Sequence, residues 1–322
     1  MWSSLLKPLA KYPWLARVSY KTLGTDTTHK LISHTVYPIF CGSSDPVVLG
    51  QQINKLAVSN IKTILHLALE DHRLYCPDKY CQTLFEVIPL LQRDDMVAIK
   101  LTGLVDRELL IKNQNVSEKV IPLIRPIVSL CANRQLAVTI DAEETNLEEA
   151  VRDVTRRLMC IYNRDQAIVY QTYQCYLHTT EDRVLEDLEL SKSEGFYLGA
   201  KLVRGAYLEW ESKRPDPKVW SNIEFTAHCY NRIAEKLMPE LGSNLILATH
   251  NDKAVRHLST RASQMQIKPK FAQLLGLNDK LTHQLANDNQ IVYKFVPFGP
   301  IDIVLPYLLR RLEETKLANH VN

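Results

Sequence analysis

The chain has 322 residues, 46% of them hydrophobic, so it is long enough to bury the core of one large domain or two ordinary ones. Its 39 basic and 36 acidic residues give a formal net charge of only +3, which argues against a dedicated DNA-binding protein. The seven cysteines show no dense pairing pattern, which favours free thiols in a reducing compartment. No stretch reaches the roughly 18 apolar residues that span a bilayer, so we expect no transmembrane segment.

The first 25 residues form a locally basic segment. They contain Lys7, Lys11, Arg17 and Lys21, and no acidic residue precedes Asp26. Apolar residues lie between these charges, namely Trp2, Leu5, Leu6, Trp14 and Leu15. This pattern fits a mitochondrial targeting segment, a helix lying on an anionic membrane, or an ordinary amphipathic surface helix. The three interpretations stay open.

Eight short β-prone runs recur after residue 40. They cover residues 63–67, 96–101, 136–141, 167–171, 199–203, 244–249, 271–275 and 291–296. Strands alternating with helices over roughly 250 residues predict a parallel sheet, and eight such units close as a (β/α)₈ barrel. A doubly wound sheet competes, but the chain has no G-x-G, no P-loop and no G-x-S-x-G elbow. We therefore predict an α/β barrel over residues 41–322, preceded by a helical extension over residues 1–40.

Segments with helical periodicity separate the predicted strands. In the clearest one, the apolar positions recur at helical spacing, and they are Leu147, Val151, Val154, Leu158 and Ile161. Thr145 precedes this run and Glu148 follows three residues later, which predicts a capping box at the start of the helix.

Polar residues lie at or just beyond the ends of five predicted strands. They are Lys100, Asp141, Gln171, Arg204 and His250. Any one of them also fits the solvated start of a loop. Because the active sites of such barrels lie at the C-terminal ends of the strands, five in succession favour a site there.

A helix with two distinct faces is predicted near the C-terminus, from Pro306 onwards. The apolar face contains Leu305, Leu308, Leu309 and Leu312, and the opposite face contains Tyr307, Arg310, Arg311 and Glu314. A surface helix with an Arg310–Glu314 pair explains this spacing. Two adjacent guanidinium groups also suit a clamp for a carboxylate, because arginine binds carboxylates bidentately and stays charged. Spacing alone leaves both interpretations open.

Nine short motifs follow one another along the chain. In the second half they are KLVRGAY at 201–207, ATHN at 248–251, FAQLLG at 271–276, FVPFG at 295–299 and PYLLRRLEE at 306–314. In the first half they are FCGSSD at 40–45, KLTGL at 100–104, IDAEE at 140–144 and YQTYQ at 170–174. In this order and at this spacing they resemble the flavin-dependent proline dehydrogenases. The resemblance covers nearly the whole chain after residue 40.

The resemblance implies a distorted (β/α)₈ barrel that binds FAD noncovalently. It further implies oxidation of L-proline to Δ1-pyrroline-5-carboxylate by hydride transfer to flavin N5, with the electrons passed to a membrane quinone. The expected partners are thus L-proline and a quinone, with peripheral membrane association and no nucleic acid. The implied location is the mitochondrial inner membrane or matrix, or cytoplasm associated with the inner membrane in a bacterium.

The resemblance also assigns site residues. Lys100, Arg310 and Arg311 match positions that hold the substrate carboxylate, and Asp141 matches one that lines the pocket near flavin and substrate. The positions that shape the pocket around the ring are Tyr207, Leu274, Phe295 and Tyr307. The positions that match FAD contacts are Gln171, Lys201, Arg204, Gly205, Ala206, Thr249, His250, Asn251, Gln273 and Glu314.

The chain departs from the family pattern at three positions. Phe295 stands where the family commonly has tyrosine, Thr315 where an asparagine often follows RRLxE, and Leu208 where an aromatic residue often follows GAY. The last two changes concern flavin contacts. We also predict no metal site, because His72, Cys76 and Cys81 have no nearby fourth ligand for a structural zinc.

Three other functions compete with proline oxidation. A relative on the same scaffold oxidises hydroxyproline, and only pocket details separate the two substrates. Lys100 or Lys201 at a strand end is also suited to forming a Schiff base, as in aldolases, if an apolar environment lowers its pKa. A catalytically inactive barrel that binds a flavin is the third alternative.

Overall fold

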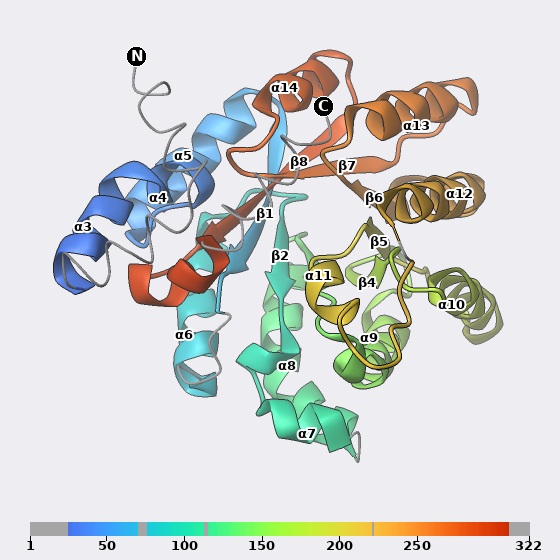
Figure 1. Cartoon of the computed structure of the whole chain (residues 1–322), viewed down its shortest axis with the longest axis horizontal. Helices are drawn as coiled ribbons and strands as arrows, with labels where there is room; N and C mark the ends of the chain where they lie inside the picture. The colour runs from blue at the N-terminus through green and yellow to red at the C-terminus, as the bar shows by residue number, and fades with distance from the viewer. Residues whose placement is uncertain (1–24, 70–75, 113–114, 221, 309–322) are drawn as a thin grey trace.

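The computed structural model describes residues 25–69, 76–112, 115–220 and 222–308. Eight parallel strands close into a barrel in the order of the sequence (Figure 1). The strands are β1 Ile61–Leu67, β2 Met96–Ile99, β3 Ala137–Ile140, β4 Val169–Gln174, β5 Ala200–Val203, β6 Leu245–Ala248, β7 Lys270–Leu274 and β8 Ile291–Phe298. Each predicted run overlaps one of them, so the (β/α)₈ prediction is confirmed and the doubly wound sheet is excluded.

Helices surround the barrel (Figure 1). The longer ones are α5 Pro46–Val58, α6 Pro77–Val87, α8 Val116–Asn133, α9 Glu148–Tyr162, α10 Thr180–Glu194, α12 Ile223–Leu241, α13 Asp252–Gln264 and α14 Asp279–Asn287. The shorter ones are α3 Thr25–Thr35, α4 Tyr37–Phe40, α7 Arg107–Lys112 and α11 Leu208–Glu211, and residues 301–308 are also helical. Short 3-10 turns are η2 Ile88–Leu90, η3 Leu101–Gly103, η4 Thr145–Leu147 and η5 Gly242–Asn244. No helix in these described ranges is long and apolar enough to cross a membrane.

The pleat of the strands decides which side chains enter the barrel. Alternate residues of a strand point to opposite faces, so each strand sends one set inward and one set towards the helices. We call the end of the barrel at the N-terminal ends of the strands the lower end and the opposite one the upper end. The inward set of the lower barrel is closely packed and contains Ile64, Met96, Ala98, Tyr170, Ile246, Ala272 and Tyr293. The outward set joins the helices in a larger core that includes Val97, Val169 and Phe271. The barrel interior is therefore packed at this level, and polar side chains lie above it.

The helix predicted after the third strand is present, but the predicted capping box is wrong. Thr145 starts the 3-10 turn η4, and α9 begins only at Glu148 with Leu147 as its N-cap and no side-chain cap. The backbone N–H of Thr145 donates to Glu211 Oε1 at 2.8 Å. Ile161, predicted on the buried face, is 45% exposed. A tertiary contact has thus replaced the local cap.

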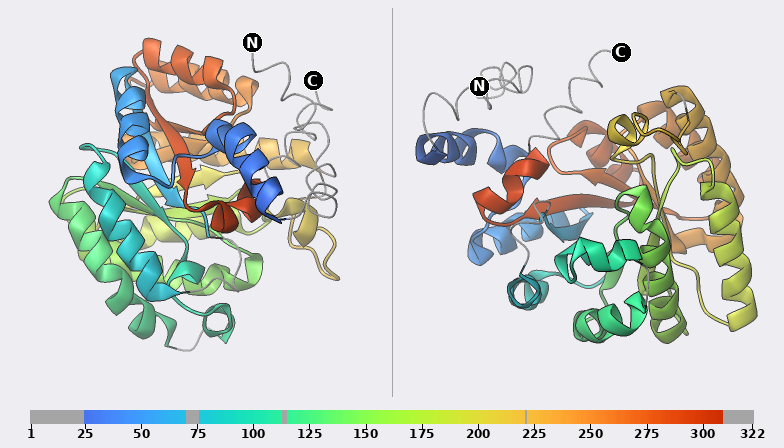
Figure 2. Two further views of the ribbon diagram at one scale, coloured as in Figure 1. Left: turned by 90° about the vertical axis from the view of Figure 1, so that its left-hand side faces the viewer. Right: turned by 60° about the horizontal axis from the view of Figure 1, so that its bottom comes forward.

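The described part of the N-terminal extension packs against the C-terminal helix. Ile32, Val36 and Phe40 form one apolar cluster with a group from other elements, namely Ala68, Val304, Tyr307 and Leu308. Figure 2 shows α3 beside the last helical segment. The boundary at residue 40 remains a prediction. Residues 1–24 lie outside the described residues, so the interpretations of the basic segment stay open.

Candidate active site

A buried ion pair lies at the C-terminal end of the barrel. Lys201 of β5 donates from Nζ to Oδ1 of Asp141, which directly follows β3, over 2.6 Å. Their side chains are only 6% and 11% exposed. Burial alone would raise the pKa of the Asp141 carboxyl, but the charges of Lys201, His66 and Lys100 outweigh it and hold that pKa below its ordinary value. Asp141 is therefore an ionised carboxylate in a nearly dry site.

His66 of β1 lies on the other side of this carboxylate. Its Nδ1 is 3.9 Å from Asp141 Oδ2 and 3.3 Å from the carbonyl oxygen of Ala98. The ring of Phe295 lies 5.1 Å from the imidazole, centroid to centroid, and Lys201 Nζ lies 4.9 Å from the Phe295 centroid. The sequence analysis missed His66. The available signal was a single imidazole in the otherwise largely apolar run of β1, two residues after Ile64 on the same face.

Lys100 is buried directly after β2, at the start of the turn η3. Its charge acts on Asp141 and contributes to lowering the pKa of that carboxyl. The turn packs tightly on α6, because a Cβ atom at Gly103 would lie 2.5 Å from the ring of Tyr80. The structure thus brings Lys100 and Asp141, both from the strand-end pattern, together with Lys201, which the family resemblance had assigned to FAD.

Glu143, in the loop after β3, binds the turn after β2 through its carboxylate and the end of β4 through its backbone carbonyl. Its Oε1 accepts from the backbone N–H of Thr102 at 3.2 Å and its Oε2 accepts from the Thr102 hydroxyl at 2.6 Å. Gln174 Nε2 donates to the Glu143 carbonyl oxygen at 2.8 Å. This second buried carboxylate therefore fixes the loops around the site.

The structure does not bring Gln171 to this group. Tyr173, two residues on, donates its hydroxyl to Asp187 of α10 at 2.7 Å, which marks the side of β4 that faces the helices. Gln171 lies on that same side, whereas Thr172 and Gln174 alternate into the barrel with Tyr170. The inward amide on this strand is therefore Gln174, four residues after Tyr170 in the YQTYQ motif.

The loop after β5 places a cation with unused donors. Nε and Nη2 of Arg204 are buried and have no hydrogen-bond partner among the described residues, and burial lowers the Arg204 pKa. The guanidinium lies 5.6 Å from the ring centroid of Tyr230 in α12. Buried donors normally have partners, so this pair suits an anionic group such as a cofactor phosphate.

Gly205 allows the backbone to pass an aromatic ring. Its φ is +125°, and a Cβ atom there would lie 1.5 Å from Tyr176. Only glycine fits both conditions. The next two residues differ from each other, since Ala206 is exposed whereas Tyr207 packs against the cluster of Tyr176, Leu177 and Val219.

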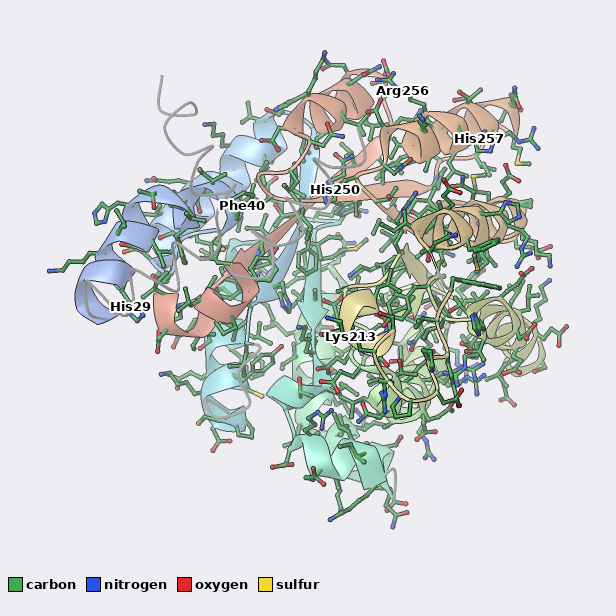
Figure 3. The ribbon with its side chains drawn as sticks, viewed as in Figure 1. His29, Phe40, Lys213, His250, Arg256 and His257 are labelled. Atoms are coloured by element: carbon green, nitrogen blue, oxygen red, sulfur yellow. The ribbon has the colours of Figure 1, made fainter. Side chains whose placement is uncertain are left out.

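The loop after β6 contains the imidazole of His250 and the helix cap Asn251. The backbone N–H of Leu274 donates to His250 Nε2 at 3.2 Å, which fixes this imidazole at the barrel mouth (Figure 3). Asn251 Oδ1 accepts from the Ala254 N–H at 2.8 Å and so caps α13, while the Asn251 N–H donates to Thr249 Oγ1 at 3.2 Å. Thr249 and Asn251 therefore have structural partners of their own.

In β7, Leu274 points into the barrel and Gln273 does not. Ala272 belongs to the inner cluster, so Leu274 shares its face, and Leu274 pairs in register with Phe295. Gln273 Oε1 instead accepts from the hydroxyl of Thr282 in α14. The structure thus supplies Leu274 and Phe295 as an apolar wall and uses Gln273 to attach α14.

The role of the C-terminal arginine pair stays a prediction. Arg310, Arg311 and Glu314, together with Thr315, lie outside the described residues, as does His72 of the zinc interpretation. Over the described part of this helix both Tyr307 and Leu308 are buried, so it is not a free surface helix with Tyr307 exposed. Tyr307 packs in the cluster with Phe40. Among the described residues, no three potential metal ligands converge.

The comparisons with known proteins agree with one another. The family model described as "Proline dehydrogenase" matches residues 51–321. The chain is 37% identical over 227 residues to proline dehydrogenase 1, mitochondrial, of Drosophila melanogaster, which covers 64% of this chain and 33% of that protein. It is 37% identical over 194 residues to the Homo sapiens protein of the same name, covering 55% and 32%. It is 34% identical over 220 residues to hydroxyproline dehydrogenase of Xenopus laevis, covering 64% and 47%.

Solved structures of proline utilization A (PutA) share the fold. The protein from Bdellovibrio bacteriovorus, inactivated by N-propargylglycine, superposes with a TM-score of 0.78 at 18% identity, covering 87% of this chain and 32% of that one. A PutA with proline bound in remote sites gives 0.73 at 23% identity, covering 92% and 33%. The chain thus spans about a third of the length of the first relatives it matches.

Proposed function

Because this chain belongs to the proline dehydrogenase family, we propose that it oxidises L-proline to Δ1-pyrroline-5-carboxylate with FAD as cofactor and passes the electrons to a membrane quinone. The observation that carries the proposal is the buried group of Lys100, Asp141 and Lys201 at the C-terminal end of the barrel. Proline is a zwitterion, so its site needs both a cation and an anion. This group provides both inside a closed apolar barrel.

Each end of the substrate has a candidate partner. Lys100 faces the site as a cation for the carboxylate, and we propose that Arg310 and Arg311 complete that clamp. Asp141 is ionised and receives the amine. Leu274 and Phe295 cover the methylene groups of the ring, and burying that apolar area orients the substrate.

The chain's own residues fit a flavin. When bound, FAD supplies the acceptor of the hydride at its N5 atom, so the protein needs to supply binding and orientation rather than a nucleophile. The unused donors of Arg204 suit a phosphate, and the backbone at Gly205 permits close approach. We propose Lys201 and His250 as further contacts, and Gln174 in place of Gln171 because of the pleat. The residues that hold these contacts in place through their own hydrogen bonds are then Thr249, Asn251 and Gln273. The roles that the family pattern gives are kept for Ala206, Tyr207, Tyr307 and Glu314.

Proline is preferred over hydroxyproline in this proposal. The Xenopus laevis relative is named for hydroxyproline, which makes that amino acid the second candidate. A ring hydroxyl pressed against Phe295 finds no hydrogen-bond partner on that side chain. A buried unpaired hydroxyl is costly, so the apolar wall supports proline.

The Schiff-base alternative is less suited to Lys201. A nucleophilic lysine needs an amine that is free to attack, and the amine of Lys201 already donates to the carboxylate of Asp141 at 2.6 Å. The Drosophila melanogaster and Homo sapiens relatives, among others, are named mitochondrial, so we propose a mitochondrial location at the inner membrane or in the matrix. Contact with a quinone then implies peripheral association with that membrane.

The proposal is tested by an anaerobic titration of the purified protein. We expect a yellow protein whose flavin absorbance is bleached by L-proline. A colourless protein that FAD cannot reconstitute contradicts the proposal. A flavin that proline does not reduce favours the inactive barrel, and borohydride trapping of a carbonyl substrate would favour the Schiff base.

A further inference from the structure

Glu211 is a buried carboxylate in the loop after β5, outside the group of Lys100, Asp141 and Lys201. It is the last residue of the short helix α11, and its side chain is only 3% exposed. Glutamates are almost never buried this deeply without partners, because an unpaired buried charge is costly. The partners of Glu211 therefore indicate which contact requires a carboxylate there.

Both oxygens of the Glu211 carboxylate accept hydrogen bonds. Oε1 accepts from the backbone N–H of Thr145 at 2.8 Å, and Oε2 accepts from Arg214 Nη1 at 3.1 Å. Thr145 starts η4 in the loop after β3, whereas Arg214 lies three residues beyond Glu211 in the same loop. Of these two contacts, the first joins different loops of the barrel.

Each of the joined loops contains a residue of the candidate active site. Asp141 lies four residues before Thr145. Tyr207 lies four residues before Glu211, and the Glu211 backbone N–H donates to the Tyr207 carbonyl oxygen at 2.8 Å, so both belong to one helical turn. While Thr145 holds this turn, Tyr207 cannot move away from the loop of Asp141.

The start of the same segment is attached by packing. Gly205 passes Tyr176 so closely that a Cβ atom would lie 1.5 Å from the ring, and Tyr207 and Leu208 pack against the cluster that contains Tyr176. Such packing is not directional, whereas a hydrogen bond to a carboxylate fixes both a distance and a direction. The contact of Glu211 is therefore suited to setting the position of the segment.

We infer that Glu211 is a positioning residue, which holds residues 204–211 against the loop after β3 and so keeps Tyr207 in place beside the substrate. This inference rests on the proposed function. Without the contact, the segment occupies the binding-competent position only part of the time. The apparent affinity for substrate then falls with that fraction, whereas the saturated enzyme reacts at the same rate.

Two variants remove the contact from opposite sides. Glu211→Ala removes the acceptor, and Thr145→Pro removes the donor, because proline has no backbone N–H. Proline suits this position, since Thr145 is the first residue of a 3-10 turn and Glu144 before it is extended, with φ −60° and ψ 152°. Each variant should raise KM for L-proline about tenfold, as expected for a lost hydrogen bond to a charged group, and should leave kcat nearly unchanged.

Three further variants are matched controls. Glu211→Gln keeps an acceptor for the Thr145 N–H, and Thr145→Ala keeps the N–H itself, so both should have a KM close to that of the wild type. Asp216→Ala removes an exposed carboxylate from the same loop and should not change KM. The double variant Glu211→Ala/Thr145→Pro should have the KM of either single variant, because all three lack the same contact.

Amide hydrogen exchange measures the position of the segment without the reaction. Residues 205–212 should exchange faster in Glu211→Ala and in Thr145→Pro than in the wild type, and Glu211→Gln should match the wild type. A merely structural role of Glu211 would lower the free energy of unfolding in urea without changing KM. If Thr145→Pro does not fold, the comparison of Glu211→Ala with Glu211→Gln carries the test.

The outcomes separate this inference from the proposed function. A wild-type KM in Glu211→Ala, or a KM in Glu211→Gln as high as in Glu211→Ala, overturns the role of Glu211 and leaves proline oxidation standing. A fall in kcat without a rise in KM overturns that role as well. A protein that binds FAD but never oxidises proline contradicts the proposed function, and hydrogen exchange then shows whether Glu211 holds the segment.

Discussion

Two aspartates, one at each end of the barrel, have different kinds of partner and pKa values shifted in opposite directions. Asp95, just before β2, accepts the backbone N–H of Thr63 at 2.8 Å and that of Gln92 at 2.9 Å, and burial raises its pKa above the ordinary value. Asp141, just after β3, faces the side-chain cations Lys201 and Lys100, and its pKa is lowered. Backbone N–H groups hold the carboxylate at the lower end, whereas charged side chains surround the one at the upper end.

Two lysines, the half-buried Lys270 and the buried Lys201, follow the same division. Lys270, at the start of β7, donates to the Tyr170 hydroxyl at 3.0 Å and to the Ser243 carbonyl, and burial lowers its pKa to about 8. Lys201 has a carboxylate for its partner. The lower lysine therefore needs no charge to keep its contacts, while the upper one depends on charge. A site for a zwitterion is expected only at the upper end.

The largest effect is expected from Lys201→Met. This change leaves Asp141 buried beside one cation fewer, and breaking a buried pair costs about 3–5 kcal/mol of the free energy of unfolding. Lys270→Met is the matched control at the lower end and should cost clearly less, because its partners are neutral. Urea unfolding at pH 7 measures both. Equal losses would remove the distinction between the two ends.

Arg311→Met addresses the part of the upper end that lies outside the described residues. If the arginine pair holds the substrate carboxylate, kcat/KM for proline should fall by the equivalent of about 2–4 kcal/mol, and Arg310→Met should behave similarly. The free energy of unfolding should change little. Near-normal kcat/KM in Arg311→Met would favour a purely structural helix.

Phe295 tests the apolar wall. Wild-type kcat/KM should favour L-proline over trans-4-hydroxy-L-proline by about 1–3 kcal/mol, which is the usual cost of a buried unpaired hydroxyl. In Phe295→Ser the difference in kcat/KM between the two amino acids should decrease, because the smaller serine leaves room for the ring hydroxyl and offers it a hydroxyl as hydrogen-bond partner. An enzyme that handles both amino acids equally well would argue against proline as the preferred substrate.

The last prediction concerns the pH dependence of stability that comes from Lys270. Its folded pKa of about 8 lies below the unfolded value of 10.5, so the unfolded chain binds the extra proton in that window. The contribution of Lys270 to stability should therefore rise between pH 8 and pH 10.5 and be lost as the pH falls through about 8. Lys270→Met should flatten this slope in urea unfolding at the two pH values. An unchanged slope would show that Lys270 is not the group responsible.

The strands and their order could be predicted because each is a local apolar run, and five of the eight have a polar residue at or just beyond the end. Lys100, Asp141 and Arg204 were found in this way. Local pattern does not fix which face of a strand enters the barrel, because register is set by pairing with distant strands. For that reason the family resemblance could assign Gln171 and Gln273 to FAD although the pleat turns both side chains towards the helices. His66 was missed because it lies inside a strand, whereas the strand-end pattern covers only residues at or beyond the ends.

The closure of the barrel also has a consequence for synthesis of the chain. β1 pairs with β8 from Ile61↔Val292 to Leu67↔Phe298, so its outer edge has no partner until the ribosome has made the last strand. At about 5–20 residues per second, the roughly 220 intervening residues take about 10–45 s. For that time the nascent protein presents an open, largely apolar strand edge to its neighbours. Protection by a chaperone is thus expected to affect the yield of this protein more than its final stability.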